Sequence, residues 1–268
     1  MPSRRSGRRP TGSTEPVAGR KVTPEGKPRP EVTRFLAELR TTPPPTTRAA
    51  GRTMPARAGG APDSRAHLLF ALDATMSRQP TWDMAVAIQA DMFMEAAKFG
   101  GLAIKLVYFR GLDECRATGF VTDPIKLAAL MTRISCRAGR TQIGRVLRHA
   151  VTTARKQGLR AMVHVGDCCE EDPDALAAVA GELAILGVPA FFFHEGHDAF
   201  AGAVFAELAR VSGGVALPFD AASPHELSAL LKGVASYAAG GEEGLRKLAQ
   251  REAPARALLA HLSAAQKR

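Results

Sequence analysis

Four short runs of apolar residues recur between residue 67 and residue 193, and segments with helical periodicity lie between them. The runs are 67–73, 102–109, 161–165 and 188–193. Each run is mostly apolar rather than alternating with polar residues, which is typical of strands that are buried on both faces. We therefore expect an α/β fold, with a doubly wound, mostly parallel central sheet and helices on both faces in a three-layer sandwich.

The remaining elements follow from the same patterns. Residues 115–121 are a candidate edge strand, and residues 215–218 form a short strand. Apolar stripes and capping residues predict helices over 82–99, 124–134, 143–154, 174–186, 200–211 and 224–237. The segment 242–262 is also helical in pattern, with a break at Pro254.

The first 66 residues have a different composition from the rest of the chain. They hold 14 Lys and Arg against 5 Asp and Glu, a net charge of +9, and 11 of the 18 prolines. Such a stretch buries too little apolar surface to offset its ordering entropy. We expect residues 1–66 to be a disordered basic tail, 67–240 to form the domain and 241–268 to be a helical extension.

One part of the tail, residues 31–40, has helical periodicity. Phe35, Leu36 and Leu39 would share one face of a short helix. This helix would either pack on the chain's own domain or dock into a groove of a partner.

Composition also indicates the cellular compartment of the protein. No run of about 18 apolar residues is present, so we expect no transmembrane helix. The Arg-rich N-terminus lacks the apolar region of a secretory signal, and four irregularly spaced cysteines do not form a disulfide framework. These features predict a cytoplasmic protein. The absence of a Gly-x-x-x-x-Gly-Lys-Ser/Thr loop excludes a P-loop ATPase.

Oxygen-bearing side chains follow two of the predicted strands and precede one helix. Asp73, Thr75 and Ser77 alternate in the turn after the first strand, Thr141 precedes the helix from 143, and Asp167 follows the strand 161–165. The carboxyl ends of parallel strands meet at one edge of a sheet, where ligands bind. Carboxylate and hydroxyl oxygens suit a hard divalent cation, so the pattern predicts a cation site at this edge.

Asp-x-Thr-x-Ser, a Gly-x-Thr-x-x-Gly helix start and an Asp after the next buried strand together resemble the metal-ion-dependent adhesion site (MIDAS) of a von Willebrand factor type A (VWA) domain. The resemblance covers about residues 67–240 and is to soluble, bacterial-type members of the family. It implies a Rossmann-like fold and a protein that binds partners rather than an enzyme.

The resemblance also implies a role for each residue. Ser77 and Thr141 would coordinate the cation through their hydroxyls, and Thr75 would hold a position more often occupied by serine. Asp73 and Asp167 would bind directly or through water. The expected cation is Mg²⁺, with Mn²⁺ or Ca²⁺ as alternatives, and one coordination position would stay open for an acidic side chain of a partner.

The third motif departs from the family pattern, which often reads Ser/Thr-Asp-Gly. Here Asp167 lies between Gly166 and Cys168, and the acidic residues 170–172 follow. We expect these acids at the rim, where they would raise the cation affinity or repel an acidic partner. The alternative is a fold that binds no metal, in which Asp73 and Asp167 only cap turns and helices.

Other polar residues fall near the same edge. His194 and Glu195 follow the strand 188–193 and are candidates for the outer shell of the site or for partner contact. Glu170 and Arg140 are further candidates for partner contact. Cys168 is either a redox-active thiol beside the site or a small buried side chain.

Three functions are compatible with these features. The first is a MIDAS-type protein-interaction module, an adaptor for which the resemblance makes an AAA+ ATPase a candidate partner. The second is a nucleic-acid-associated protein that uses the basic tail, with the domain as scaffold. The third is a metal-dependent hydrolase, with water activated at Asp73, Asp167 and His194. This set lacks an evident general base, so we expect no enzymatic activity.

Overall fold

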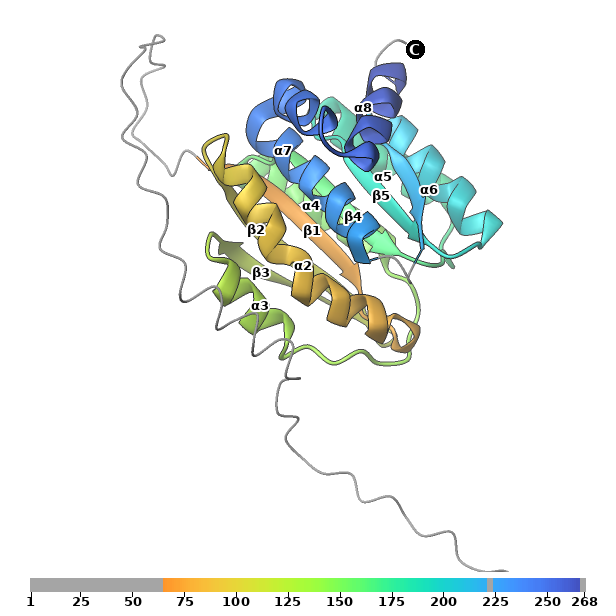
Figure 1. Ribbon diagram of the computed structural model, residues 1–268. Coiled ribbons are helices and arrows are strands. Elements are labelled where there is room, and N and C mark those ends of the chain that lie inside the picture. Colours follow the sequence, from red (N-terminus) through yellow and green to blue (C-terminus); the bar gives the residue numbers. More distant parts are fainter. Residues whose placement is uncertain (1–64, 221–223, 266–268) are drawn as a thin grey trace, which may run out of the picture.

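A computed structural model of the chain describes residues 65–220 and 224–265 (Figure 1). The predictions for residues 1–64, including the disordered tail and its short helix, lie outside these residues. The described part contains one six-stranded sheet with strand order β3-β2-β1-β4-β5-β6. The strands are β1 (Ala66–Asp73), β2 (Leu102–Arg110), β3 (Glu114–Val121), β4 (Ala161–Gly166), β5 (Ala190–Glu195) and β6 (Ala216–Phe219).

The sheet is parallel except at one edge. Strand β1 pairs in parallel with β2 and β4, and β5 pairs in parallel with β4 and β6. Strand β3 runs antiparallel to β2. This confirms the predicted fold class and the edge position of residues 115–121. It also brings the carboxyl ends of β1, β2, β4, β5 and β6 to one edge of the sheet.

Helices cover both faces of the sheet, as Figure 1 shows. One face carries α2 (Gln79–Ala97), α3 (Pro124–Met131), α7 (Pro224–Ala249) and α8 (Ala253–Ala265). The opposite face carries α4 (Ile143–Gln157), α5 (Pro173–Ile185) and α6 (Ala199–Ser212).

Strand β1 shows why a strand in the middle of this sheet is a continuous apolar run. Leu68, Phe70 and Leu72 point into the core beneath α2 and α7, whereas Leu69 and Ala71 point into the core beneath α4 to α6. Successive side chains of a strand alternate between faces, so a strand covered on both sides is apolar at every position.

The C-terminal helices pack on the sheet's first face. The element α7 consists of two helical segments that meet at a kink at Gly241, whose positive φ of 63° glycine adopts readily. The predicted break near Pro254 falls at residues 250–252, and Pro254 lies in the first turn of α8. Leu245 and Leu258 are buried in the shared core.

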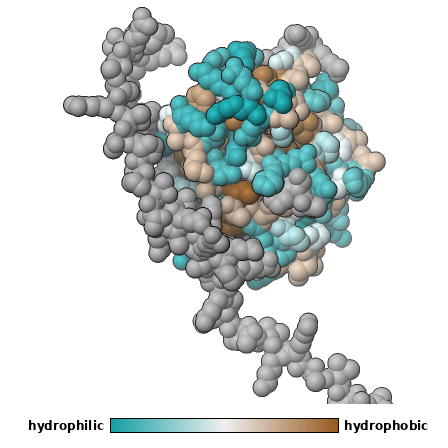
Figure 2. Space-filling model, in the orientation of Figure 1, coloured by the Kyte–Doolittle hydropathy of each residue, from teal (hydrophilic) through white to brown (hydrophobic). Residues whose placement is uncertain are grey.

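The face that carries α2 and α7 is largely hydrophilic, with scattered hydrophobic residues between the hydrophilic ones (Figure 2). Within the described ranges, no helix combines the length and hydrophobicity that crossing a membrane requires.

Candidate metal centre

The turn after β1 holds three of the predicted ligands. Asp73 ends β1 and is 3% exposed, and its Oδ1 accepts a hydrogen bond from the backbone N–H of Thr75 at 2.7 Å. The Thr75 and Ser77 hydroxyl oxygens lie 3.4 Å apart. Ser77 belongs to the 3₁₀ helix η1 (Met76–Arg78), which connects β1 to α2. The alternating spacing therefore places the two hydroxyls side by side.

Asp167 meets this turn from the neighbouring strand. Because β1 and β4 pair in parallel, the residues after their carboxyl ends lie at one edge of the sheet. The Ser77 hydroxyl donates to Asp167 Oδ2 at 3.2 Å. Asp167 Oδ1 is shielded from solvent and has no hydrogen-bond partner among the described residues. The structure thus brings Asp73, Thr75, Ser77 and Asp167 together.

Thr141 reaches the same edge through a loop that lies against the β2–β3 turn. A Cβ at Gly139 would fall 2.1 Å from the Gly111 carbonyl oxygen, so glycine is needed for this approach. Thr141 and Glu170 exchange two hydrogen bonds of 3.0 Å, each from a backbone N–H to the other side chain. Within the described residues, no direct hydrogen bond joins Thr141 to Asp73, Ser77 or Asp167.

Each of the acidic residues 170–172 accepts a hydrogen bond from at least one backbone N–H group. Glu171 accepts hydrogen bonds from the backbone N–H groups of Ile143 and Gly144 at the start of α4, the latter at 3.0 Å. Asp172 accepts from the backbone N–H of Asp174 at the start of α5. Carboxylates at helix N-termini satisfy free N–H groups and complement the helix dipole. These contacts hold the loop that carries Asp167 against the Thr141 loop.

His194 and Glu195, the last two residues of β5, contact residues next to the predicted ligands. His194 is buried, and its Nε2 lies 3.2 Å from the Asp167 carbonyl oxygen. Glu195 forms an ion pair with Arg78 and accepts a hydrogen bond from the Thr81 hydroxyl. Both residues therefore contact neighbours of the predicted ligands, which is compatible with the predicted outer-shell role. Arg140 is exposed, and its backbone N–H donates to the Gly111 carbonyl at 3.0 Å.

Sequence reasoning missed Arg78. Its side chain is 2% exposed, it pairs with Glu195, and one guanidinium nitrogen lies 3.8 Å from Asp167 Oδ2. An arginine at the start of an amphipathic helix normally points to solvent, and no local pattern marks this one as buried. Only the pairing of β1 with β4, and of β4 with β5, brings residues 78, 167 and 195 together.

Burial governs the ionisation of the site. It raises the pKa of Asp73 to about 6, against the opposing hydrogen bonds of Thr75. Burial likewise raises the pKa of the Cys168 thiol to about 12. A reactive cysteine needs a lowered pKa, so the Cys168 environment favours an inert thiol over a redox-active one.

The donor set fits a hard divalent cation. The shielded and unpartnered Asp167 Oδ1, next to the Ser77 and Thr75 hydroxyls, is an acceptor for which a bound cation would supply the missing partner. Within residues 65–220 and 224–265, no three or more His, Cys, Asp and Glu side chains group to hold a metal. The predicted shell, with two carboxylates and three hydroxyls, does not depend on such a group.

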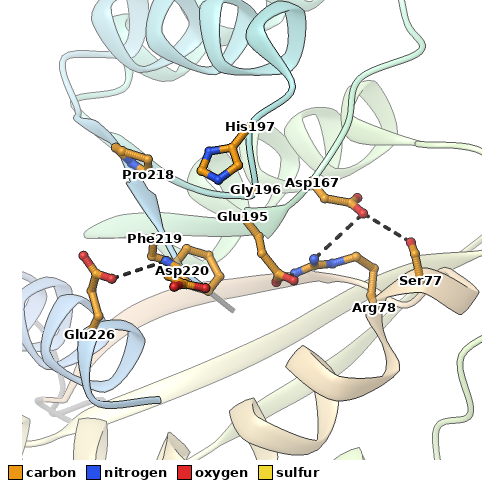
Figure 3. A pocket seen from close by; sticks show the side chains of 10 residues that line it. All are labelled: Ser77, Arg78, Asp167, Glu195, Gly196, His197, Pro218, Phe219, Asp220 and Glu226. Carbon is orange, nitrogen blue, oxygen red and sulfur yellow. Dashed lines mark hydrogen bonds and ion pairs between the residues drawn. The ribbon is translucent and has the colours of Figure 1, made fainter. Parts of the chain in front are cut away.

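A pocket of about 480 Å³ opens beside these ligands (Figure 3). Figure 3 shows Arg78 lying between Glu195 and Asp167, with Ser77 on the far side of Asp167. Glu226 accepts a hydrogen bond from the Asp220 backbone N–H at 3.3 Å. The pocket is lined by Ser77, Arg78, Asp167, Glu195, Gly196, His197, Pro218, Phe219, Asp220 and Glu226.

The fold is a three-layer α/β sandwich around a mostly parallel sheet. Solved structures with a similar fold include the VWA domain of SpRpn10, at 12% identity and a TM-score of 0.47, where the match covers 57% of this chain and 88% of that one. The vWF domain of the pilus tip protein Mfa5 from Porphyromonas gingivalis matches at 11% identity and a TM-score of 0.47, over 65% of this chain and 95% of that one.

A third similar structure is proximal thread matrix protein 1 from the mussel byssus, with a zinc-occupied MIDAS motif, at 16% identity and a TM-score of 0.47. The match covers 64% of this chain and 45% of that one, so this chain spans about half its length. No protein-family model and no curated protein matches the chain.

Proposed function

We propose that this chain is a protein-interaction module with a divalent-cation site at the carboxyl edge of its sheet. Asp73, Thr75, Ser77, Thr141 and Asp167 would hold Mg²⁺, directly or through water, and a carboxylate of a partner protein would complete the shell. The cation would supply a fixed positive charge for that carboxylate. The protein's own groups position the cation, and we propose no catalytic step.

The unpartnered oxygen of Asp167 is the observation that carries this proposal. Asp167 Oδ2 accepts a hydrogen bond from the Ser77 hydroxyl in the turn after β1. Asp167 Oδ1 has no donor next to it among the described residues. A buried carboxylate oxygen without a partner is costly, and a bound cation removes that cost.

Apolar side chains around the site support an interaction surface. Met76, Leu112 and Phe200 are three of the five exposed large hydrophobic residues in the described part of the chain. They follow β1, β2 and β5, and therefore lie at the same edge as Asp73 and Asp167. Apolar contacts next to one charged contact are typical of the centre of a protein interface.

The neighbouring pocket narrows the chemistry of the partner. It has four carboxylates, from Asp167, Glu195, Asp220 and Glu226, against the one guanidinium of Arg78. This excess of negative charge disfavours a second acidic side chain. We propose a partner whose contacting carboxylate is flanked by neutral or basic residues.

The proposed class of partner and the proposed cellular compartment are argued from the sequence. The family resemblance makes an AAA+ ATPase a candidate partner and this chain its adaptor. We propose a cytoplasmic setting, which the four free cysteines support.

A photo-crosslinking amino acid tests the interaction face even when the partner is unidentified. Placed at Met76 or Phe200, it should give discrete protein crosslinks in cell extract with Mg²⁺, and these should disappear with EDTA or with Asp73→Ala. Ile185 is the matched control, because it is an exposed apolar residue at the C-terminal end of α5. Crosslinks that persist in EDTA, or that are equal from Ile185, would contradict the proposal.

A further inference from the structure

Arg78 is a buried positive charge directly beside the proposed cation site. It ends η1, one residue after Ser77, and its side chain is 2% exposed. Buried guanidinium groups are tolerated when carboxylates surround them. Here the two carboxylates come from the loop after β4 and from the end of β5.

The two carboxylates differ in how they hold Arg78. Glu195 contacts the guanidinium directly, is 13% exposed and is fixed by the Thr81 hydroxyl. Asp167 is 27% exposed, and its Oδ2 lies 3.8 Å from the guanidinium while it accepts from Ser77. Glu195 is therefore the main partner of Arg78, and Asp167 is shared between Arg78 and the cation site.

We propose that Arg78 is a built-in cation that sets the divalent-metal affinity of this site. It neutralises Asp167 when no metal is bound, and it repels an incoming divalent cation. This inference rests on the proposed function, because it needs a metal at Asp167. Arg78 is a positioning residue, since it acts through Asp167 and is not a ligand.

Electrostatics give the direction of the effect. Like charges repel, and the repulsion between close charges is several-fold stronger near a protein surface than in bulk water. The negative charge of Glu195 offsets part of the repulsion that Arg78 exerts. Removing the Arg78 charge should therefore tighten metal binding, and removing the Glu195 charge should weaken it.

Mn²⁺ titration calorimetry, paired with thermal unfolding with and without Mn²⁺, tests the proposal on the full chain. Arg78→Met should bind Mn²⁺ about tenfold or more tightly than the wild type. Arg78→Lys keeps the charge and should bind with an affinity near that of the wild type. Glu195→Gln, which frees Arg78 to pair with Asp167, should bind several-fold more weakly.

The unfolding data separate this role from a purely structural one. Without metal, Arg78→Met should lower the Tm, because Glu195 and Asp167 lose their counter-charge. Mn²⁺ should then raise its Tm by more than it raises that of the wild type. A purely structural arginine would lower the Tm equally with and without Mn²⁺, and that result would overturn the proposal.

The remaining outcomes also decide. Affinity of Arg78→Met equal to or weaker than that of the wild type overturns the role of Arg78 and leaves the cation site intact. If Arg78→Met does not fold, the Mn²⁺ affinity of Glu195→Gln tests the proposal. An affinity equal to or higher than that of the wild type would overturn it. Binding by Arg78→Met alone supports the role of Arg78 and contradicts a working site in the natural chain. If neither the wild type nor Arg78→Met binds Mn²⁺, the result contradicts both the role of Arg78 and the proposed cation site.

Discussion

The Ser77 hydroxyl donates to Asp167 Oδ2 at 3.2 Å, and so links two residues that lie 90 positions apart in the chain. This hydrogen bond joins the turn after β1 to the loop after β4, at the edge where parallel strands of an α/β sheet carry their ligands. It is the direct structural link between the first and third motifs of the predicted site.

Ser77→Ala tests that link. The variant loses one hydroxyl ligand and the donor to Asp167, so Mn²⁺ affinity should fall at least tenfold, which is about 1.4 kcal/mol. Stability without metal should fall by only about 1 kcal/mol, because one partly exposed hydrogen bond is lost. Calorimetry and urea unfolding measure the two effects. Unchanged Mn²⁺ affinity would exclude Ser77 as a ligand.

Asp73→Asn should stabilise the metal-free protein. Burial raises the pKa of Asp73 to about 6, so the folded state holds this proton more tightly than the unfolded state does. The stabilising contribution of the protonated form is therefore lost as pH rises from about 3.8 to 6, and above pH 6 the ionised group is destabilising.

At pH 7.5, the neutral amide should add roughly 1–3 kcal/mol to the free energy of unfolding and abolish metal binding. Urea unfolding in EDTA and Mn²⁺ titration measure both properties. A metal-free variant that is less stable than the wild type at this pH would show that the Asp73 carboxylate is not a destabilising group.

His164 should make the protein sensitive to acid. It is buried in β4 among Phe109, Phe192 and Phe205, and neither ring nitrogen has a hydrogen-bond partner in the part of the chain that the structure describes. Burial, together with the charge of Arg78, lowers its pKa to about 3. The folded state therefore keeps His164 neutral, and stability is lost as pH falls from about 6.5 towards 3.

His164→Leu removes that proton site and should flatten the fall in Tm between pH 6.5 and 4.5. His197 is exposed, so His197→Leu serves as the matched control and should leave the pH profile of the wild type in place. An unaltered acid profile for His164→Leu would assign the sensitivity to other groups.

Gly139→Ala should disturb the loop that carries Thr141. The added Cβ would lie 2.1 Å from the Gly111 carbonyl oxygen, so the backbone must move. We expect a loss of about 2 kcal/mol or more in stability and a weaker Mn²⁺ affinity. Gly119→Ala is the control, because no atom lies within 4 Å of its Cβ position. Equal behaviour of the two variants would show that the close approach is not required.

The fold was predictable because each strand is a local signal. An apolar run such as 67–73 is covered on both faces whatever its neighbours are, and the helices between the runs are long and periodic. The ends of the elements were less accurate. The predicted helix over 82–99, for example, is α2 (Gln79–Ala97), whereas the predicted break between residues 237 and 242 agrees with the kink at Gly241.

The site was predictable only in part, for a related reason. Asp73 and Asp167 follow buried strands, and strand ends can be located from the sequence. The burial of Arg78 and its pairing with Glu195 depend on three adjacent strands and have no local signature. The capping role of Glu171 at α4 was equally hidden, because its partners lie 27 and 28 residues away.

Mn²⁺ titration calorimetry of the wild type and Asp167→Ala tests the central claim most directly. Asp198→Ala is the control, because Asp198 is an acidic residue after β5 that caps α6 through two backbone N–H groups. The account predicts saturable binding of one Mn²⁺ by the wild type and by Asp198→Ala, and none by Asp167→Ala. Binding that survives in a folded Asp167→Ala variant, or no binding by the wild type at millimolar Mn²⁺, would contradict it.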